Sequence, residues 1–155
     1  MTAIEIRPSR FGAPIAQRMV AAAQDELAER YGSHDANPIE SGQFDPPEGL
    51  FLLAWLGDEP VGCGGWRAVP DIAEGAAEIK RMFVNPDARN AGVATALLRA
   101  IEDSARERGV RRLILETGLQ QPEAIALYTK LGYERIANYG HYKDAPDCVS
   151  FARDL

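Results

Sequence analysis

The strongest constraint on the fold lies in the middle of the chain, where an extended apolar segment leads through a short turn into a long amphipathic helix. Ala76–Val84 has the composition of a strand and ends before Asn85 and Pro86. Ala91–Arg108 follows, with apolar residues at three- and four-residue spacing on one face, and Gly109 ends it. A strand that leads directly into a helix is typical of mixed α/β proteins, in which the helix packs on the sheet.

Weaker patterns on both sides of this unit predict the rest of the fold. Six further strands are predicted over Ala3–Pro8, Leu50–Leu56, Val61–Val69, Leu113–Thr117, Tyr133–Ala137 and Cys148–Ala152. Two further helices are predicted, one from Ile15 to Gly32 and one over Pro122–Leu131. A strand-rich first half followed by alternating strands and helices predicts an α/β fold with a mixed sheet of about seven strands and helices on both faces.

One residue breaks the alternation of the strand Ala76–Val84. Strict alternation places Arg81 on the same face as Ile79 and Phe83, both of which are apolar. Either a β-bulge reverses the faces at this point, or the arginine side chain points into a site.

Length, charge and cysteine content restrict the class of protein. The 155 residues predict one domain, and the net charge of −6 disfavours a nucleic-acid-binding surface. The sequence has no signal-peptide pattern and no long apolar run, which predicts a cytoplasmic protein with no membrane association. Because Cys63 and Cys148 lie far apart and no histidine stands at metal-ligand spacing, no metal site is expected.

The turn before the central helix has the composition of an anion-binding site. A helix start exposes unpaired backbone N–H groups and the positive end of the helix dipole. Gly92 lets a phosphate approach the backbone, and Arg89 adds a positive charge. The turn lacks the GK[ST] of a P-loop and the GxGxxG spacing of a dinucleotide site. An ordinary loop with Asn90 as the helix cap is the alternative.

Two segments, in the same order and spacing, resemble the GNAT superfamily of N-acetyltransferases. They are Glu78–Pro86 followed by Arg89, Gly92 and Ala94 in an RxxGxA arrangement, and Ala124–Tyr128 followed by Leu131–Tyr133, similar to AxxLYxxxGF. The predicted order of strands and helices also matches, so that the resemblance covers essentially the whole chain and implies one N-acetyltransferase domain over residues 1–155.

The resemblance implies acetyl-CoA as co-substrate. It implies that Met82, Phe83 and Val84 pair with the pantetheine arm like an added strand, and that this strand splays away from Leu113–Thr117. It also implies that the backbone of the following turn holds the coenzyme diphosphate, through Arg89, Asn90, Ala91, Gly92, Val93, Ala94 and Thr95.

The resemblance also implies two catalytic residues. Acyl transfer to an amine requires a group that accepts the ammonium proton, and the leaving thiolate requires a proton donor. Glu78 matches the position of the family's general base, and Tyr128 matches its general acid. An ion pair of Glu78 with Lys80, and a purely core role for Tyr128, are the structural alternatives.

Residues for the acceptor are less constrained. Trp66, Arg67 and Arg81 are candidates for binding a carboxylate of the acceptor, and Tyr139 is a candidate for a pocket wall. Exposed arginines at strand ends and a turn capped by aromatic residues are the alternatives. The sequence thus predicts acetyl transfer from acetyl-CoA to a primary amine of a small molecule such as an amino acid. The alternatives are a protein or peptide acetyltransferase and a catalytically silent acyl-CoA-binding module. A homodimer is compatible with each of these functions.

Overall fold

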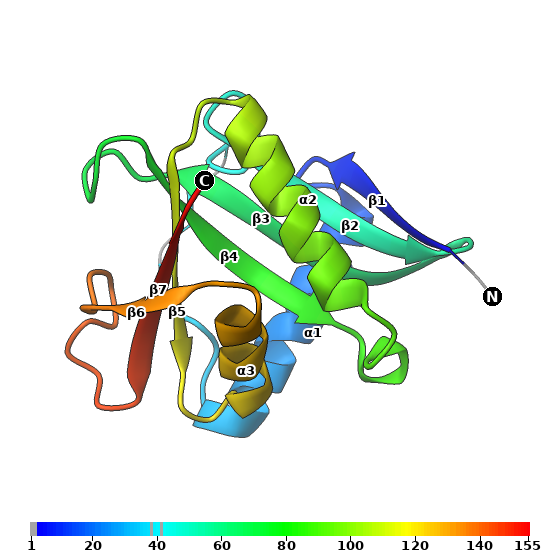
Figure 1. Cartoon of the computed structure of the whole chain (residues 1–155). Helices are drawn as coiled ribbons and strands as arrows, with labels where there is room; N and C mark the ends of the chain where they lie inside the picture. The colour runs from blue at the N-terminus through cyan, green and yellow to red at the C-terminus, as the bar shows by residue number, and fades with distance from the viewer. Residues whose placement is uncertain (1–2, 38, 41) are drawn as a thin grey trace.

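A seven-stranded mixed sheet forms the centre of the computed structural model, which describes residues 3–37, 39–40 and 42–155 (Figure 1). The strand order is β1-β2-β3-β4-β5-β7-β6. The strands are β1 (Ile4–Ser9), β2 (Gly49–Leu56), β3 (Glu59–Ala68), β4 (Ala76–Val84), β5 (Arg112–Gly118), β6 (Glu134–Ile136) and β7 (Cys148–Asp154). The helices are α1 (Pro14–Tyr31), α2 (Val93–Glu107) and α3 (Pro122–Lys130), with a short 3₁₀ helix at Pro86–Ala88. The predicted fold class is confirmed.

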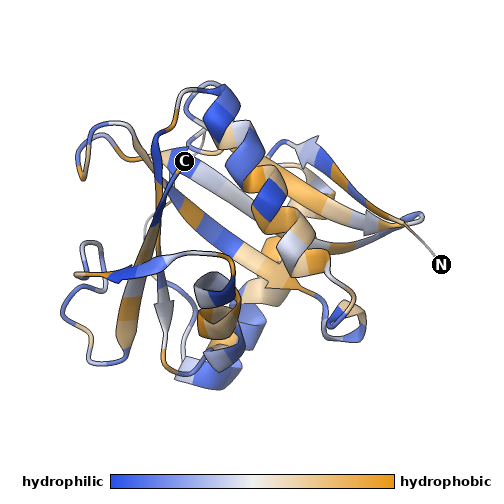
Figure 2. Ribbon diagram, viewed as in Figure 1, coloured by the Kyte–Doolittle hydropathy of each residue, from blue (hydrophilic) through white to orange (hydrophobic). Residues whose placement is uncertain are grey.

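Helices cover both faces of the sheet, which explains the unbroken apolar run of β2. Leu52 and Ala54 belong to the core under α2 and α3, whereas Phe51 and Leu53 belong to the core under α1. A strand that is buried on both faces has no polar side to alternate with. Figure 2 shows this apolar strand together with hydrophilic bands on the outward surface of α2.

The sheet opens between its two central strands. β4 and β5 are parallel and pair at only three positions, the last of which joins Glu78 to Ile114. Beyond this pair, β4 continues to Val84 and β5 to Gly118 without pairing to each other. The two strands therefore diverge and leave backbone edges that are not used by the sheet.

A β-bulge lies at the start of this divergence. Cys63 of β3 pairs with Phe83, but two residues later Gly65 pairs with Lys80, so that β4 contains an extra residue. Arg81 takes up this irregularity with a left-handed φ of 59°. The bulge places Ile79 in the core under α2 and Phe83 in the core under α1. This reversal of faces confirms the first of the two sequence-based explanations.

None of the helices in the described part of the chain combines the length and apolar character that crossing a membrane requires.

Candidate active site

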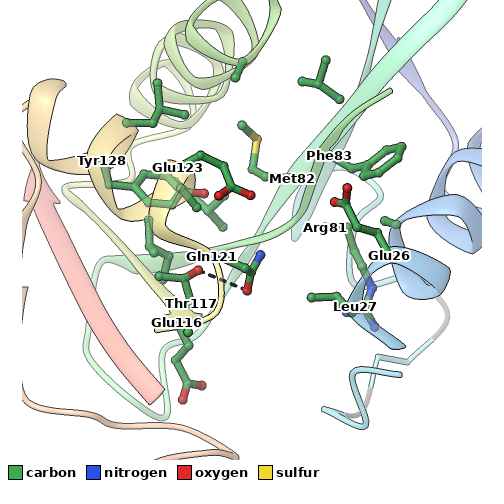
Figure 3. A pocket seen from close by; sticks show the side chains of 18 of the residues that line it. Glu26, Leu27, Arg81, Met82, Phe83, Glu116, Thr117, Gln121, Glu123 and Tyr128 are labelled. Atoms are coloured by element: carbon green, nitrogen blue, oxygen red, sulfur yellow. Dashed lines mark hydrogen bonds between the residues drawn. The ribbon is translucent and has the colours of Figure 1, made fainter. Parts of the chain in front are cut away.

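A cavity of about 780 Å³ lies where β4 and β5 separate. Its walls come from the free part of β4, the end of β5, the start of α2, one face of α3 and the C-terminal part of α1. Figure 3 shows Tyr128 and Glu123 on one side of this space, and Arg81, Phe83 and Glu26 on the other. The volume lies in the range of pockets that bind small molecules and cofactors.

Contacts from the end of α1 close one side of the cavity. The Tyr31 hydroxyl donates a hydrogen bond to Gln121 Oε1 at 3.2 Å, and Arg30 Nη1 donates to the Gln120 carbonyl oxygen at 2.9 Å. A Cβ at Gly118 would lie 2.0 Å from the Tyr31 hydroxyl, so that only glycine leaves room for this ring. The end of α1 is thus tied to the loop that follows β5.

The start of α2 exposes a run of unused backbone donors toward the cavity. Ala96 N–H is the first to bond within this turn, to the Gly92 carbonyl oxygen at 3.0 Å. Within the described residues, the six amide groups of residues 90–95 have no hydrogen-bond acceptor, and no side chain caps the helix. Gly92 is the N-cap with a φ of 84°, and a Cβ there would meet nothing within 4 Å. This turn therefore presents open backbone N–H groups to a ligand.

Most of the residues expected to bind the cofactor line the cavity, and Ala91 is the exception. The lining set comprises Met82, Phe83, Val84, Arg89, Asn90, Gly92, Val93, Ala94 and Thr95. Asn90 does not cap the helix but adopts a left-handed φ of 66° that helps to form the turn. Arg89 contacts Glu26 Oε1 at 2.5 Å and donates through Nε to the Val84 carbonyl oxygen at 3.0 Å. Its guanidinium is therefore held in place beside the turn.

Tyr128 lies on the cavity wall and is 5% exposed. Its ring packs against Tyr133 with centroids 5.6 Å apart, and its hydroxyl has no hydrogen-bond partner within the described residues. Burial raises the pKa of Tyr128 well above the ordinary value of a phenol. The hydroxyl is therefore protonated at neutral pH and available as a donor to a group in the cavity.

Glu78 is buried behind the cavity wall, and both of its carboxylate oxygens accept hydrogen bonds. Its Oε1 accepts hydrogen bonds from Arg67 Nε at 3.1 Å and Nη2 at 2.9 Å, and its Oε2 accepts one from the Tyr139 hydroxyl at 2.7 Å. Burial and the Glu78 carboxylate together raise the pKa of Tyr139 strongly. The expected alternative partner of Glu78, Lys80, is instead paired with Asp35. Glu78, Arg67 and Tyr139 thus form one unit, and none of the three lines the cavity.

Trp66 lies in the core and not in the cavity. It is 1% exposed, and its indole N–H donates a hydrogen bond to Ser104 Oγ of α2 at 3.0 Å. Alternation along β3 directs Trp66 to the face under α2, where its indole donor is already used. This position speaks against the substrate role expected from the sequence.

An ionic cluster around Asp35 was missed by the sequence analysis. Asp35 follows α1 and is 13% exposed in its side chain; its Oδ2 contacts Arg81 Nη1 and lies 3.1 Å from Lys80 Nζ. Its Oδ1 accepts hydrogen bonds from the Tyr142 hydroxyl at 2.8 Å and from the Asn37 amide at 2.9 Å. Burial alone would raise the pKa of Asp35, but Lys80, the Asn37 amide and Arg81 lower it well below its usual range.

Asp35→Asn is expected to lower the free energy of unfolding at pH 7 by about 3 kcal/mol, because it leaves two buried cations without their carboxylate. The depressed pKa means that ionised Asp35 stabilises the fold above a pH of about 4 and that this contribution disappears as the pH falls further. Urea unfolding of both proteins between pH 7 and pH 3 should therefore show a stability difference that shrinks with falling pH. A difference that does not depend on pH would contradict this account.

Glu116 of β5 is a second residue that the sequence analysis missed. It lines the cavity, its Oε2 accepts a hydrogen bond from the Cys148 thiol at 3.2 Å, and its buried Oε1 has no partner. Burial, followed by the hydrogen bond to Glu116, raises the pKa of Cys148 to about 12, so that the thiol stays protonated and remains a donor. The available signal was a carboxylate inside the otherwise apolar strand Leu113–Thr117.

Comparisons with known proteins agree with this geometry. The sequence profile of the acetyltransferase (GNAT) family matches residues 15–133. An "IAA acetyltransferase" from Azospirillum brasilense is 37% identical over 124 residues, which cover 80% of this chain and 78% of that protein.

Solved structures show the same fold. An acyl-CoA N-acyltransferase structure from Klebsiella pneumoniae has a TM-score of 0.81 at 29% identity and covers 98% of this chain and 97% of that one. A GNAT family acetyltransferase from Elizabethkingia anophelis, solved with acetyl-CoA bound, has a TM-score of 0.69 at 22% identity and covers 98% of both chains. The splayed sheet, the uncapped helix start and these similarities together identify the chain as an acyltransferase enzyme that belongs to the GNAT acetyltransferase family.

Proposed function

We propose that this protein is an N-acetyltransferase that moves an acetyl group from acetyl-CoA to a primary amine of a small molecule by direct attack. The observation that carries the proposal is the run of six unused amide donors at residues 90–95, five of which belong to residues that line the cavity between β4 and β5. Open backbone N–H groups at a helix start suit a diphosphate, and a free strand edge suits a pantetheine arm with its two amides.

The residues present fit this coenzyme. The turn at residues 90–95 would hold the diphosphate, because Gly92 leaves its backbone uncovered. Met82, Phe83 and Val84 would pair with the pantetheine arm along the edge of β4 that β5 does not use. The acetyl-CoA bound to the Elizabethkingia anophelis relative supports the same choice of ligand.

Tyr128 is the proposed general acid. The bound thioester would supply the acetyl group and a thiolate leaving group, which needs a proton as the bond to sulfur breaks. The raised pKa keeps Tyr128 protonated over the whole neutral range, and its hydroxyl has no competing partner in the described residues, so that a proton is held there for the thiolate.

Two carboxylates are candidates for the group that takes the proton from the acceptor ammonium. Glu78, the candidate from the sequence, has both oxygens engaged by Arg67 and Tyr139 and can act only through that network. Glu116, unlike Glu78, belongs to the cavity lining, and its Oε1 has no hydrogen-bond partner, although this oxygen is buried beside Gly140 and must turn to reach a ligand. We therefore favour Glu116 as the proton acceptor and keep Glu78 as the second candidate.

Glu116→Gln and Glu78→Gln are expected to separate these roles. Glu116→Gln should lower kcat on the order of 100-fold with little loss of stability, because it removes a base but no ion pair. Glu78→Gln should mainly lower the melting temperature, because it leaves Arg67 buried without its carboxylate. Rate profiles against pH and thermal melts of both variants measure this. A folded Glu78→Gln protein without activity, beside an active Glu116→Gln protein, would reverse the assignment.

The test of the proposed function is CoA release from acetyl-CoA across a panel of primary amines, with mass detection of the acetylated product. The expected result is turnover of at least one small amine, with lysine-containing and N-terminal peptides acetylated much more slowly. Tight CoA binding without turnover of any amine would favour a silent acyl-CoA-binding module. Faster acetylation of peptides than of small amines would favour a protein acetyltransferase.

A further inference from the structure

We infer that the acceptor carries a carboxylate on the same small molecule as its amine, and that Lys80 and Arg81 bind this carboxylate. The inference rests on the proposed function and names the class of acceptor. Both residues line the cavity and come from the middle of β4, where Figure 2 shows a hydrophilic band between apolar segments of the strand.

The charges in this cluster do not balance. Lys80 and Arg81 are 8% and 7% exposed in their side chains, and within the described residues Asp35 is the carboxylate that contacts them. Two cations against one carboxylate leave a net charge of about +1 in a wall that is largely removed from water. Because the attraction between opposite charges is stronger in low-dielectric surroundings, this wall attracts an anion.

The cluster also has more hydrogen-bond donors than acceptors. Asp35 accepts from four groups, since Lys80 and Arg81 share Oδ2 while Tyr142 and the Asn37 amide share Oδ1. Arg81 Nε is buried without an acceptor, and Lys80 Nζ has a single acceptor within the described residues. A lysine ammonium has three N–H donors and a guanidinium has five, so donors remain for a second carboxylate.

The coenzyme phosphates are not the expected ligand of this cluster. The bulge directs Met82 to the core under α2, whereas Arg81 reaches Asp35 in the segment after α1. The cations therefore lie across β4 from the amide donors of α2, which are the site proposed for the diphosphate. A carboxylate at Lys80 and Arg81 must come from the other substrate.

The opposite wall suits the amine end of such an acceptor. Figure 3 shows Arg81 and Glu116 on opposite sides of the cavity. Of the other carboxylates that line this space, Glu26 and Glu123 are engaged by Arg89 and Arg30, and Asp147 lies on the same side as Cys148. Glu116 has an unpartnered Oε1 that is buried beside Gly140 and would have to turn toward the cavity to meet an ammonium group. A molecule with an ammonium at one end and a carboxylate at the other, such as a free amino acid, complements both walls.

The experiment compares each amino acid with its amide and with the amine left when the carboxyl group is removed. In the unaltered protein, kcat/KM for the acids should exceed that for the amides roughly 10- to 100-fold, which is the effect of charged hydrogen bonds. Lys80→Gln should reduce this ratio about tenfold, and Lys143→Gln, at an exposed lysine of the 137–147 loop, should leave it unchanged. Asp35→Asn should increase the ratio, since it removes the competing carboxylate.

Lys80→Gln is expected to lower the acid-to-amide ratio and Asp35→Asn to raise it, so that the inference can be tested even where one of the two variants folds poorly. Equal turnover of acids and amides would overturn the anion site and leave the proposed function standing. Titration calorimetry of the acids with CoA-saturated protein tests the anion site independently of turnover. Acids that bind in a Lys80-dependent manner, in a protein that never releases CoA from acetyl-CoA, would support the anion site and overturn the proposed function.

Discussion

Gly92→Glu is expected to weaken CoA binding by 100-fold or more while the protein remains folded. Gly92 lies at the start of α2 among the unused amide donors, and a side chain there meets no neighbouring atom. The glutamate would place a negative charge beside the proposed diphosphate site, and like charges about 4 Å apart repel by about 4 kcal/mol at an effective dielectric constant of about 20. Titration calorimetry with CoA measures the loss.

Two control variants isolate the charge from the backbone strain. Gly92→Gln introduces the same shape and the same left-handed strain without the charge, so its loss of affinity should be much smaller. Gly109, just beyond the other end of α2, has a φ of 83° and equally open surroundings. Gly109→Glu should therefore bind CoA normally. Unchanged affinity in a folded Gly92→Glu protein would remove this turn from the binding site.

Tyr128→Phe is expected to reduce kcat on the order of 100-fold or more with little change in melting temperature. The ring contacts with Tyr133 and Phe151 do not need the hydroxyl, which has no partner in the described part of the chain. Because the raised pKa keeps Tyr128 protonated, the unaltered enzyme should lose no activity through this residue up to a pH of about 10. Steady-state kinetics from pH 6 to pH 10 test both statements.

Tyr133→Phe is the matched control for this variant. The Tyr133 hydroxyl donates a hydrogen bond to buried Glu102 Oε2 at 2.8 Å and does not line the cavity. Its loss should lower the free energy of unfolding by about 1 to 3 kcal/mol and leave kcat of the folded protein close to that of the unaltered enzyme. If Tyr128→Phe instead lost stability and kept its turnover, Tyr128 would be a core residue.

The sheet could be predicted from the sequence because its elements have strong local patterns. The amphipathic pattern of α2 is typical of a helix on a sheet, and the apolar run of β2 is typical of a strand that is buried on both faces. Every predicted boundary of a helix or strand lies within two residues of the observed one. The broken alternation at Arg81 also predicted a real irregularity, since that residue has a φ of 59°. Local periodicity thus determined where strands and helices lie.

The contacts that shape the acceptor side could not be predicted in this way. Asp35 and Tyr142 meet although they are more than one hundred residues apart, and neither lies in a helix or strand. The partner of Glu78 was also missed, because Arg67 stands opposite it on a neighbouring strand and cross-strand register is not visible in one sequence. Such contacts depend on how loops and strands come together in three dimensions.

The most direct test of the central claim is isothermal titration calorimetry of the folded protein with CoA. The claim is that the uncapped start of α2 and the free edge of β4 form the coenzyme site. It predicts saturable binding of one CoA per chain, weakened by Gly92→Glu and unaffected by Gly109→Glu. A protein that melts cooperatively but gives no binding heat at several temperatures, and is not stabilised by CoA in thermal melts, would contradict it.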